Sequence, residues 1–104
     1  MKKYEGRREG YAVIVTVNAA PLNPRLDLWN HSPTGFEWGY GGSGPAQLAL
    51  ALLVDCLGDD DQAVALCHPF KFAVVAKLPH EGWTLTSEQI HATVAELSQS
   101  ERRP

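Results

Sequence analysis

The residues best suited to chemistry form a glycine-rich segment at 39–44, directly before an Ala/Leu-rich run. Its order, Gly39-Tyr40-Gly41-Gly42-Ser43-Gly44, satisfies the spacing G-x-G-x-x-G. Glycines allow positive φ and close approach of another group. The first amides of a helix lack intrahelical partners, and the helix dipole favours an anion there. The segment therefore predicts a phosphate or carboxylate site formed by Tyr40, Gly41, Gly42, Ser43 and Gly44.

A second explanation of the same segment needs no ligand. The glycines would let the helix dock tightly on a sheet, with Ser43 as its N-cap and Pro45 in its first turn. The two nucleotide-binding folds with similar loops do not fit. The helix is followed by three aspartates with no intervening strand, and Pro45 stands where a P-loop needs lysine. We weigh the packing explanation above the ligand site.

Side chains near this segment extend the candidate site. Arg25 is expected to complete the anion site, because a guanidinium beside a helix N-terminus would add a charge-assisted donor. Trp29 and His31 are candidates for contact with a partner, since tryptophan is a typical interface anchor. Phe36 and Trp38 are better explained as core residues of a small sheet.

The elements that must position these residues follow from hydrophobic pattern. Strands are expected at 11–18, 25–30 and 36–38, and residues 83–85 fit a short strand or an extended tether. Helices are expected at 46–57, at 62–77 with a kink or break at Pro69, and after a capping box formed by Thr86 and Gln89. Ile90, Val94 and Leu97 form the apolar stripe of the last helix.

This order of elements predicts an α+β fold, with a small antiparallel sheet of about three strands and three helices packed on one face. The open face of the sheet leaves room for a homodimer. Residues 1–9 are expected to be a polar lead-in or an edge strand, and residues 98–104 a frayed tail.

Composition limits the function classes. The 104 residues fit one domain, and the net charge of −3 argues against a nucleic-acid binder that works by neutralising phosphates. No run is long and apolar enough for a membrane span, and the N-terminus does not have the form of a secretory signal. Two cysteines, Cys56 and Cys67, in apolar helical contexts favour buried reduced thiols and a cytoplasmic protein.

Other chemistry has weaker support. The four histidines lack metal-ligand spacing, so neither a metal nor a cofactor is expected. His68, before Pro69, is assigned a local structural role, and Lys71 and Lys77 are assigned to a solvated helix face. His31 with Ser43 or an aspartate could serve a hydrolase or nuclease, but Ser43 lacks the strand–turn–helix context of such a nucleophile.

The stretch from His31 to Ala51, HSPTGFEWGYGGSGPAQLALA, resembles the signature of an uncharacterised family of small prokaryotic proteins. The resemblance implies members in bacteria, phages and plasmids, and it supplies no mechanism. It extends less specifically to Tyr4, Gly6 and Arg8, to Phe70 and Lys71, and to Trp83, Leu85, Thr86 and Ile90. Pro69 departs from the expected pattern.

Three hypotheses therefore stand, in this order. The first is a non-enzymatic binding module that holds an anionic small molecule or an acidic segment of a partner protein. The second is an interaction factor of mobile elements, such as an inhibitor or accessory factor of host defence. The third is a small hydrolase or nuclease.

Overall fold

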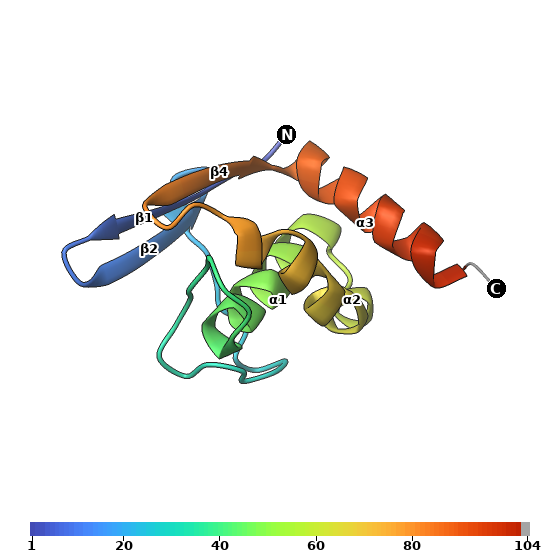
Figure 1. Cartoon of the computed structure of the whole chain (residues 1–104), viewed down its shortest axis with the longest axis horizontal. Helices are drawn as coiled ribbons and strands as arrows, with labels where there is room; N and C mark the ends of the chain where they lie inside the picture. Colours follow the sequence, from blue (N-terminus) through green and yellow to red (C-terminus); the bar gives the residue numbers. More distant parts are fainter. Residues whose placement is uncertain (103–104) are drawn as a thin grey trace.

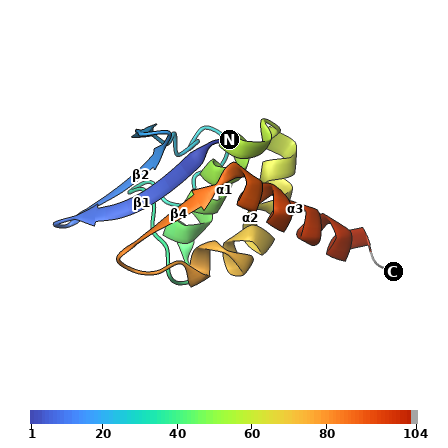
Figure 2. The same cartoon turned by 90° about the horizontal axis from the view of Figure 1, so that it is seen from above.

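The chain folds as predicted into an α+β structure, described here by a computed structural model that covers residues 1–102. The strands are β1 (Lys3–Glu9), β2 (Ala12–Val17), β3 (Ala20–Pro21) and β4 (Gly82–Thr86). The helices are α1 (Ser43–Leu57), α2 (Asp60–Ala73), the short 3-10 helix η1 (Val75–Lys77) and α3 (Ser87–Arg102). The strands form one antiparallel sheet in the order β3-β2-β1-β4. Helices α1 and α2 lie to one side of the sheet, and α3 extends from the end of β4 (Figures 1 and 2).

The sheet has four strands rather than three, because the expected lead-in at 1–9 is the inner strand β1. Its side chains alternate between the two faces. Tyr4 and Gly6 are buried against the helices, while Lys3 and Arg7 are exposed on the other face. That outer face also carries Glu5, Glu9, Ile14, Thr16 and Thr84. The face left open by the helices is therefore mostly charged and polar.

Two predicted strands, 25–30 and 36–38, are wrong, because residues 22–42 run as a long loop (Figure 1). Arg25 has a φ of 55°, outside the strand region, and opens a turn in which the Leu28 amide donates to its carbonyl at 3.1 Å. The alternation of apolar and polar residues around Leu26 and Leu28, which predicted a strand, therefore belongs to a turn. The extended segment at 83–85 is the strand β4.

The helices follow local signals closely. Gly58, with φ of 66°, ends α1 as expected. Asp59 caps α2 by accepting a hydrogen bond from the Gln62 amide. The capping box of α3 is present, with reciprocal bonds between Thr86 and Gln89 of 2.9 and 3.2 Å. Its apolar stripe is buried at Ile90 and Val94, with Leu97 packed against the core.

The ends of α2 and α3 differ from expectation. Pro69 does not divide α2, which continues to Ala73 and is followed by η1. The expected frayed tail at 98–104 is helical through Arg102, while residues 103–104 lie outside the described part. Lys77 is exposed as predicted, but Lys71 is buried, with its Nζ 4.3 Å from the centre of the Phe72 ring. Its ammonium thus makes a cation–π contact with a half-exposed aromatic ring.

The core lies between the sheet and α1. Leu48, Leu50, Leu52 and Leu53 of α1 are fully buried, which matches a helix that is apolar on nearly every side. Trp38 is buried as predicted and meets Trp83 of β4 edge to face, with ring centres 5.6 Å apart. This aromatic pair ties the long loop to the sheet.

Candidate binding groove

The glycine-rich segment leads directly into α1, but Ser43 is not its cap. Gly42 is the N-cap residue, and no side chain caps the helix. Ser43 is already the first helical residue, so its hydroxyl is past the position from which it would reach the amides of the first turn. Pro45 has no N–H, and within residues 1–102 the amides of Ser43 and Gly44 have no hydrogen-bond partner. The start of α1 therefore retains the positive end of its dipole without a side-chain acceptor.

Close packing explains three of the glycines. A Cβ at Gly44 would come within 2.7 Å of the Glu37 Cβ, and one at Gly42 within 2.4 Å of the Tyr40 ring. A Cβ at Gly41 would approach the Phe72 ring to 2.9 Å. Gly39 has a φ of 88°, a conformation that favours glycine. The geometry thus gives the packing explanation direct support.

An arginine that the site prediction omitted fixes the loop to the sheet. Arg8 of β1 donates two hydrogen bonds to the Glu37 carboxylate, at 2.8 and 3.0 Å, and one to the His80 carbonyl at 2.7 Å. Its guanidinium also lies 4.6 Å from the centre of the Trp38 ring. The hydrogen bonds from Arg8 hold the pKa of Glu37 below its usual value. Glu37 is therefore a charged carboxylate, paired with Arg8, that attaches the loop to β1.

Gln47 of α1 fixes the preceding part of the loop. Its Oε1 accepts hydrogen bonds from the His31 and Ser32 amides at 2.7 and 3.1 Å. Its Nε2 donates to the Pro24 and Trp29 carbonyls at 2.6 and 3.0 Å. The side chain is fully buried, and each of its hydrogen-bonding positions is used. One helical side chain thus supplies the hydrogen bonds that a strand partner would otherwise give this segment.

A groove of about 560 Å³ lies beside the glycine-rich segment. One wall is Tyr11, Ala12 and Val13 at the start of β2, and the other is the loop from Ser32 to Glu37. Tyr40, Ser43 and Gly44 complete the lining. Tyr11 is fully exposed and Tyr40 is 53% exposed. Three of the predicted site residues, Tyr40, Ser43 and Gly44, thus share a groove with residues that sequence reasoning missed.

Arg25 is not part of this groove. Its guanidinium bonds to the Asp27 carboxylate at 3.1 Å and to the Asp60 carboxylate at 3.3 Å, at the start of α2. The hydrogen bonds from Arg25 hold the pKa of Asp27 below its usual value. Asp60 attracts the guanidinium to the far end of α1, because α2 begins where α1 has ended. The expected pairing of Arg25 with the glycine-rich segment is therefore wrong.

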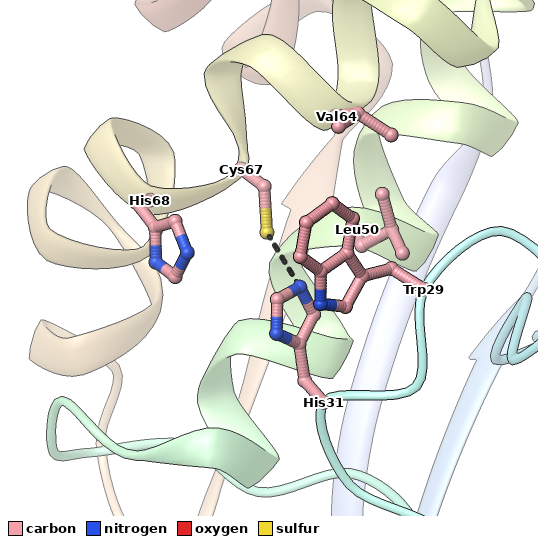
Figure 3. A pocket seen from close by; sticks show the side chains of 6 residues that line it. All are labelled: Trp29, His31, Leu50, Val64, Cys67 and His68. Atoms are coloured by element: carbon pink, nitrogen blue, oxygen red, sulfur yellow. Dashed lines mark hydrogen bonds between the residues drawn. The ribbon is translucent and has the colours of Figure 1, made fainter.

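Trp29 and His31 lie together in a second, smaller cavity of about 110 Å³ (Figure 3). Their rings stack with centres 5.4 Å apart, and the His31 ring meets the edge of His68 at 5.5 Å. The cavity is completed by Leu50, Val64 and Cys67. His68, assigned a local structural role from sequence, thus belongs to a cluster that joins the loop to α2.

Electrostatics in this cavity favour neutral groups. Burial lowers the pKa of His31, with the nearby His68 and Lys71 adding to the shift. Burial raises the pKa of the Cys67 thiol to about 11, and that thiol donates to the Ala46 carbonyl at 3.3 Å. The Cys67 Sγ is 3.9 Å from the His31 Nε2. Cys67 is therefore not an activated thiolate, because its environment favours the neutral thiol and the neutral His31 imidazole.

Within residues 1–102, no group of three or more His, Cys, Asp or Glu side chains is placed to hold a metal ion. Over the same part of the chain, every helix is too short or too polar to cross a membrane. Cys56 is half-buried, Cys67 is buried, and both are free thiols.

The signals that could have identified the groove are weak in sequence. Tyr11 sits at the tip of the β1–β2 hairpin, which is evident only once β1 is recognised as a strand. Glu37 appears in sequence as an ordinary polar residue between two aromatic ones. Its role comes from Arg8, 29 positions away in the chain.

A family model described as a family of unknown function (DUF6166) matches residues 4–96. This match covers most of the chain, including β1 at one end and most of α3 at the other. No curated protein and no solved structure matches the chain.

Proposed function

The chain belongs to the DUF6166 family of unknown function, and we propose that it is a non-catalytic binding module whose groove holds an acidic segment of a partner protein. The supporting observation is the groove itself. Its volume of about 560 Å³ suits several residues of a peptide, and two exposed tyrosines border it. Tyrosine supplies large contact area at low conformational cost, which is typical of recognition surfaces.

The acidic character of the segment follows from the start of α1. Ser43 and Gly44 line the groove, and among residues 1–102 no side chain caps the helix they begin. A carboxylate placed there would accept hydrogen bonds from their amides and interact favourably with the dipole. Glu37 also lines the groove, but its charge is offset by the paired Arg8 guanidinium. An acidic side chain or a terminal carboxylate of the partner fits this position.

A protein partner is favoured over a small anion because Arg25 is committed elsewhere. Without that guanidinium, the helix start offers a phosphate only amides and hydroxyls. A protein segment can add contacts to Tyr11 and Tyr40 on either side. A partner protein is also what an interaction factor of bacteria, phages or plasmids would require, so the binding module and the mobile-element hypothesis share this groove.

The experiment is a selection of random dodecapeptides displayed on phage against the purified chain, followed by affinity measurement of the selected peptides. Tyr40→Ala removes one tyrosine ring from the lining of the groove and should weaken binding by about tenfold or more, as expected for an aromatic anchor. Phe72→Ala is the matched control, because Phe72 is similarly exposed, at 57%, but does not line the groove. Recovery of no acidic peptide that is sensitive to Tyr40→Ala would overturn the proposal.

A further inference from the structure

One wall of the groove is an unpaired strand edge. Strand β3 pairs with β2 only at Thr16↔Pro21 and Val17↔Ala20. Beyond that pair, the Leu22 amide donates to the Val15 carbonyl at 3.1 Å, and the chain then leaves the sheet. The earlier part of β2, from Ala12 to Val15, has β1 on one side and no strand on the other.

The direction of the backbone groups follows from alternation along the strand. Asn18 donates its amide to Lys3 of β1, so residues at even positions of β2 bond toward β1. Val15 and Val17 bond toward β3, so odd positions face the outer edge. The amide and carbonyl of Val13 and the amide of Val15 therefore point outward, and within residues 1–102 none of them has a hydrogen-bond partner.

This edge also lacks the usual protection against pairing. Natural edge strands carry charges, prolines or bulges that discourage another strand from adding. The run Tyr11-Ala12-Val13-Ile14-Val15 contains no charged residue and no proline. Its two β-branched valines and isoleucine favour a strand, and Tyr11 to Val13 line the groove directly.

We propose that the partner segment binds in an extended conformation as an added strand on the outer edge of β2, between Tyr11 and Val15. This inference rests on the proposed function and specifies how the groove is used. The occupant is an extended backbone because the unpaired groups alternate donor and acceptor along a strand, a pattern that an added strand complements. Main-chain bonds to the outward amide and carbonyl of Val13, which lines the groove, supply affinity.

The test uses the peptides selected from the phage library. Val13→Pro removes the outward amide but leaves the even-numbered bonds to β1, a substitution that edge strands tolerate. Val13→Ala is the matched control, since it shortens the same side chain and keeps the amide. We expect Val13→Pro to weaken peptide binding at least about tenfold beyond Val13→Ala, as loss of a recognition hydrogen bond at an anchored interface.

A second measurement does not depend on how the proline variant folds. In the wild-type chain, peptide binding should slow hydrogen exchange of the Val13 and Val15 amides, as new β bonds do. Peptides that depend on Tyr40 but leave these amides unchanged would overturn strand addition and leave the binding function standing. Failure to select any peptide sensitive to Tyr40 would overturn both. A mass of two chains that reverts to one in Val13→Pro would assign the edge to a second copy and contradict the proposal.

Discussion

The two regions that flank the start of α1 use their polar groups in opposite ways. Around Gln47, one buried side chain makes four hydrogen bonds to the loop backbone and leaves none of its own positions open. Along the groove, and within residues 1–102, no side chain caps the start of α1 and no strand pairs with the outer edge of β2 before Val15. The first builds the fold, and the second is available to bind.

This comparison changes how the glycine-rich segment is understood. Its glycines serve packing against Glu37, Tyr40 and Phe72. The binding that we propose uses the groove beside it. The motif chosen for its resemblance to phosphate loops borders this groove, whose lining also includes the start of β2 and two tyrosines.

The largest expected effect is on the first region. Gln47→Leu keeps a similar buried volume but removes the partners of two amides and two carbonyls in the loop. We expect a loss of about 3 kcal/mol or more in the free energy of unfolding, because buried groups left without partners cost about 1–3 kcal/mol each. Urea denaturation measures it. Gln89→Ala, which removes half of the exposed capping box, should cost about 1 kcal/mol. An equal loss in both variants would contradict the central role of Gln47.

The next largest effect on stability is expected at Arg8, which binds Glu37 in the later part of the loop. Arg8→Ala removes the bidentate bond to Glu37 and the contact with Trp38, and should cost about 2 kcal/mol in unfolding free energy. Arg7→Ala is the control, because Arg7 forms an exposed pair with Glu9 that is worth less than about 0.5 kcal/mol. Thermal denaturation of the two variants distinguishes them. Similar melting temperatures would show that the Arg8–Glu37 pair does not hold the loop.

His31 should make stability depend on pH. Its pKa is lowered in the folded state, so the unfolded chain binds more protons as the pH falls through its unfolded pKa of about 6.5. Stability contributed by neutral His31 is present above that pKa and is lost below it. We expect the melting temperature to fall between about pH 7.5 and pH 5.5, and less so in His31→Gln. An identical decrease in wild type and variant would show that another group causes it.

The smallest effect on stability is expected in the groove. Tyr40 is half-exposed, so Tyr40→Ala should change the unfolding free energy by no more than about 0.5 kcal/mol. The same variant should lose most of its affinity for selected peptides. Circular dichroism with denaturant and fluorescence titration measure the two quantities on one preparation. A large destabilisation would move Tyr40 from the binding region to the structural one.

Elements held by interactions between residues close in the chain could be predicted from the sequence, and elements held by distant residues could not. The start of α3 was predictable because Thr86 and Gln89 lie within one turn of each other. The first part of the loop at 22–42 was misread because Gln47, on a helix later in the chain, binds its backbone from Pro24 to Ser32. The sequence of β1 looks polar because its outward side chains are charged. On its inner face Gly6 has no side chain, so the sequence gives no apolar residue at the position that packs on Trp83.

The candidate site was predictable in part for the same reason. Tyr40, Ser43 and Gly44 are adjacent in sequence to the helix they precede, so their position was fixed by local pattern. Arg25 was misplaced because Asp60, its partner at the start of α2, lies 35 positions away. The unpaired edge of β2 could not be predicted, because it depends on β3 being only two residues long.

Amide hydrogen exchange of the free chain tests the central contrast most directly. The Ser32 amide, bonded to Gln47, and the Ile14 amide, which faces β1, should exchange slowly. The Val13 amide, one position from Ile14 but facing the groove, should exchange close to the rate of an exposed amide. That result would show a fixed loop beside an unoccupied strand edge. Protection of Val13 equal to that of Ile14 and Ser32 would show the edge already paired, and would contradict a groove open to a partner.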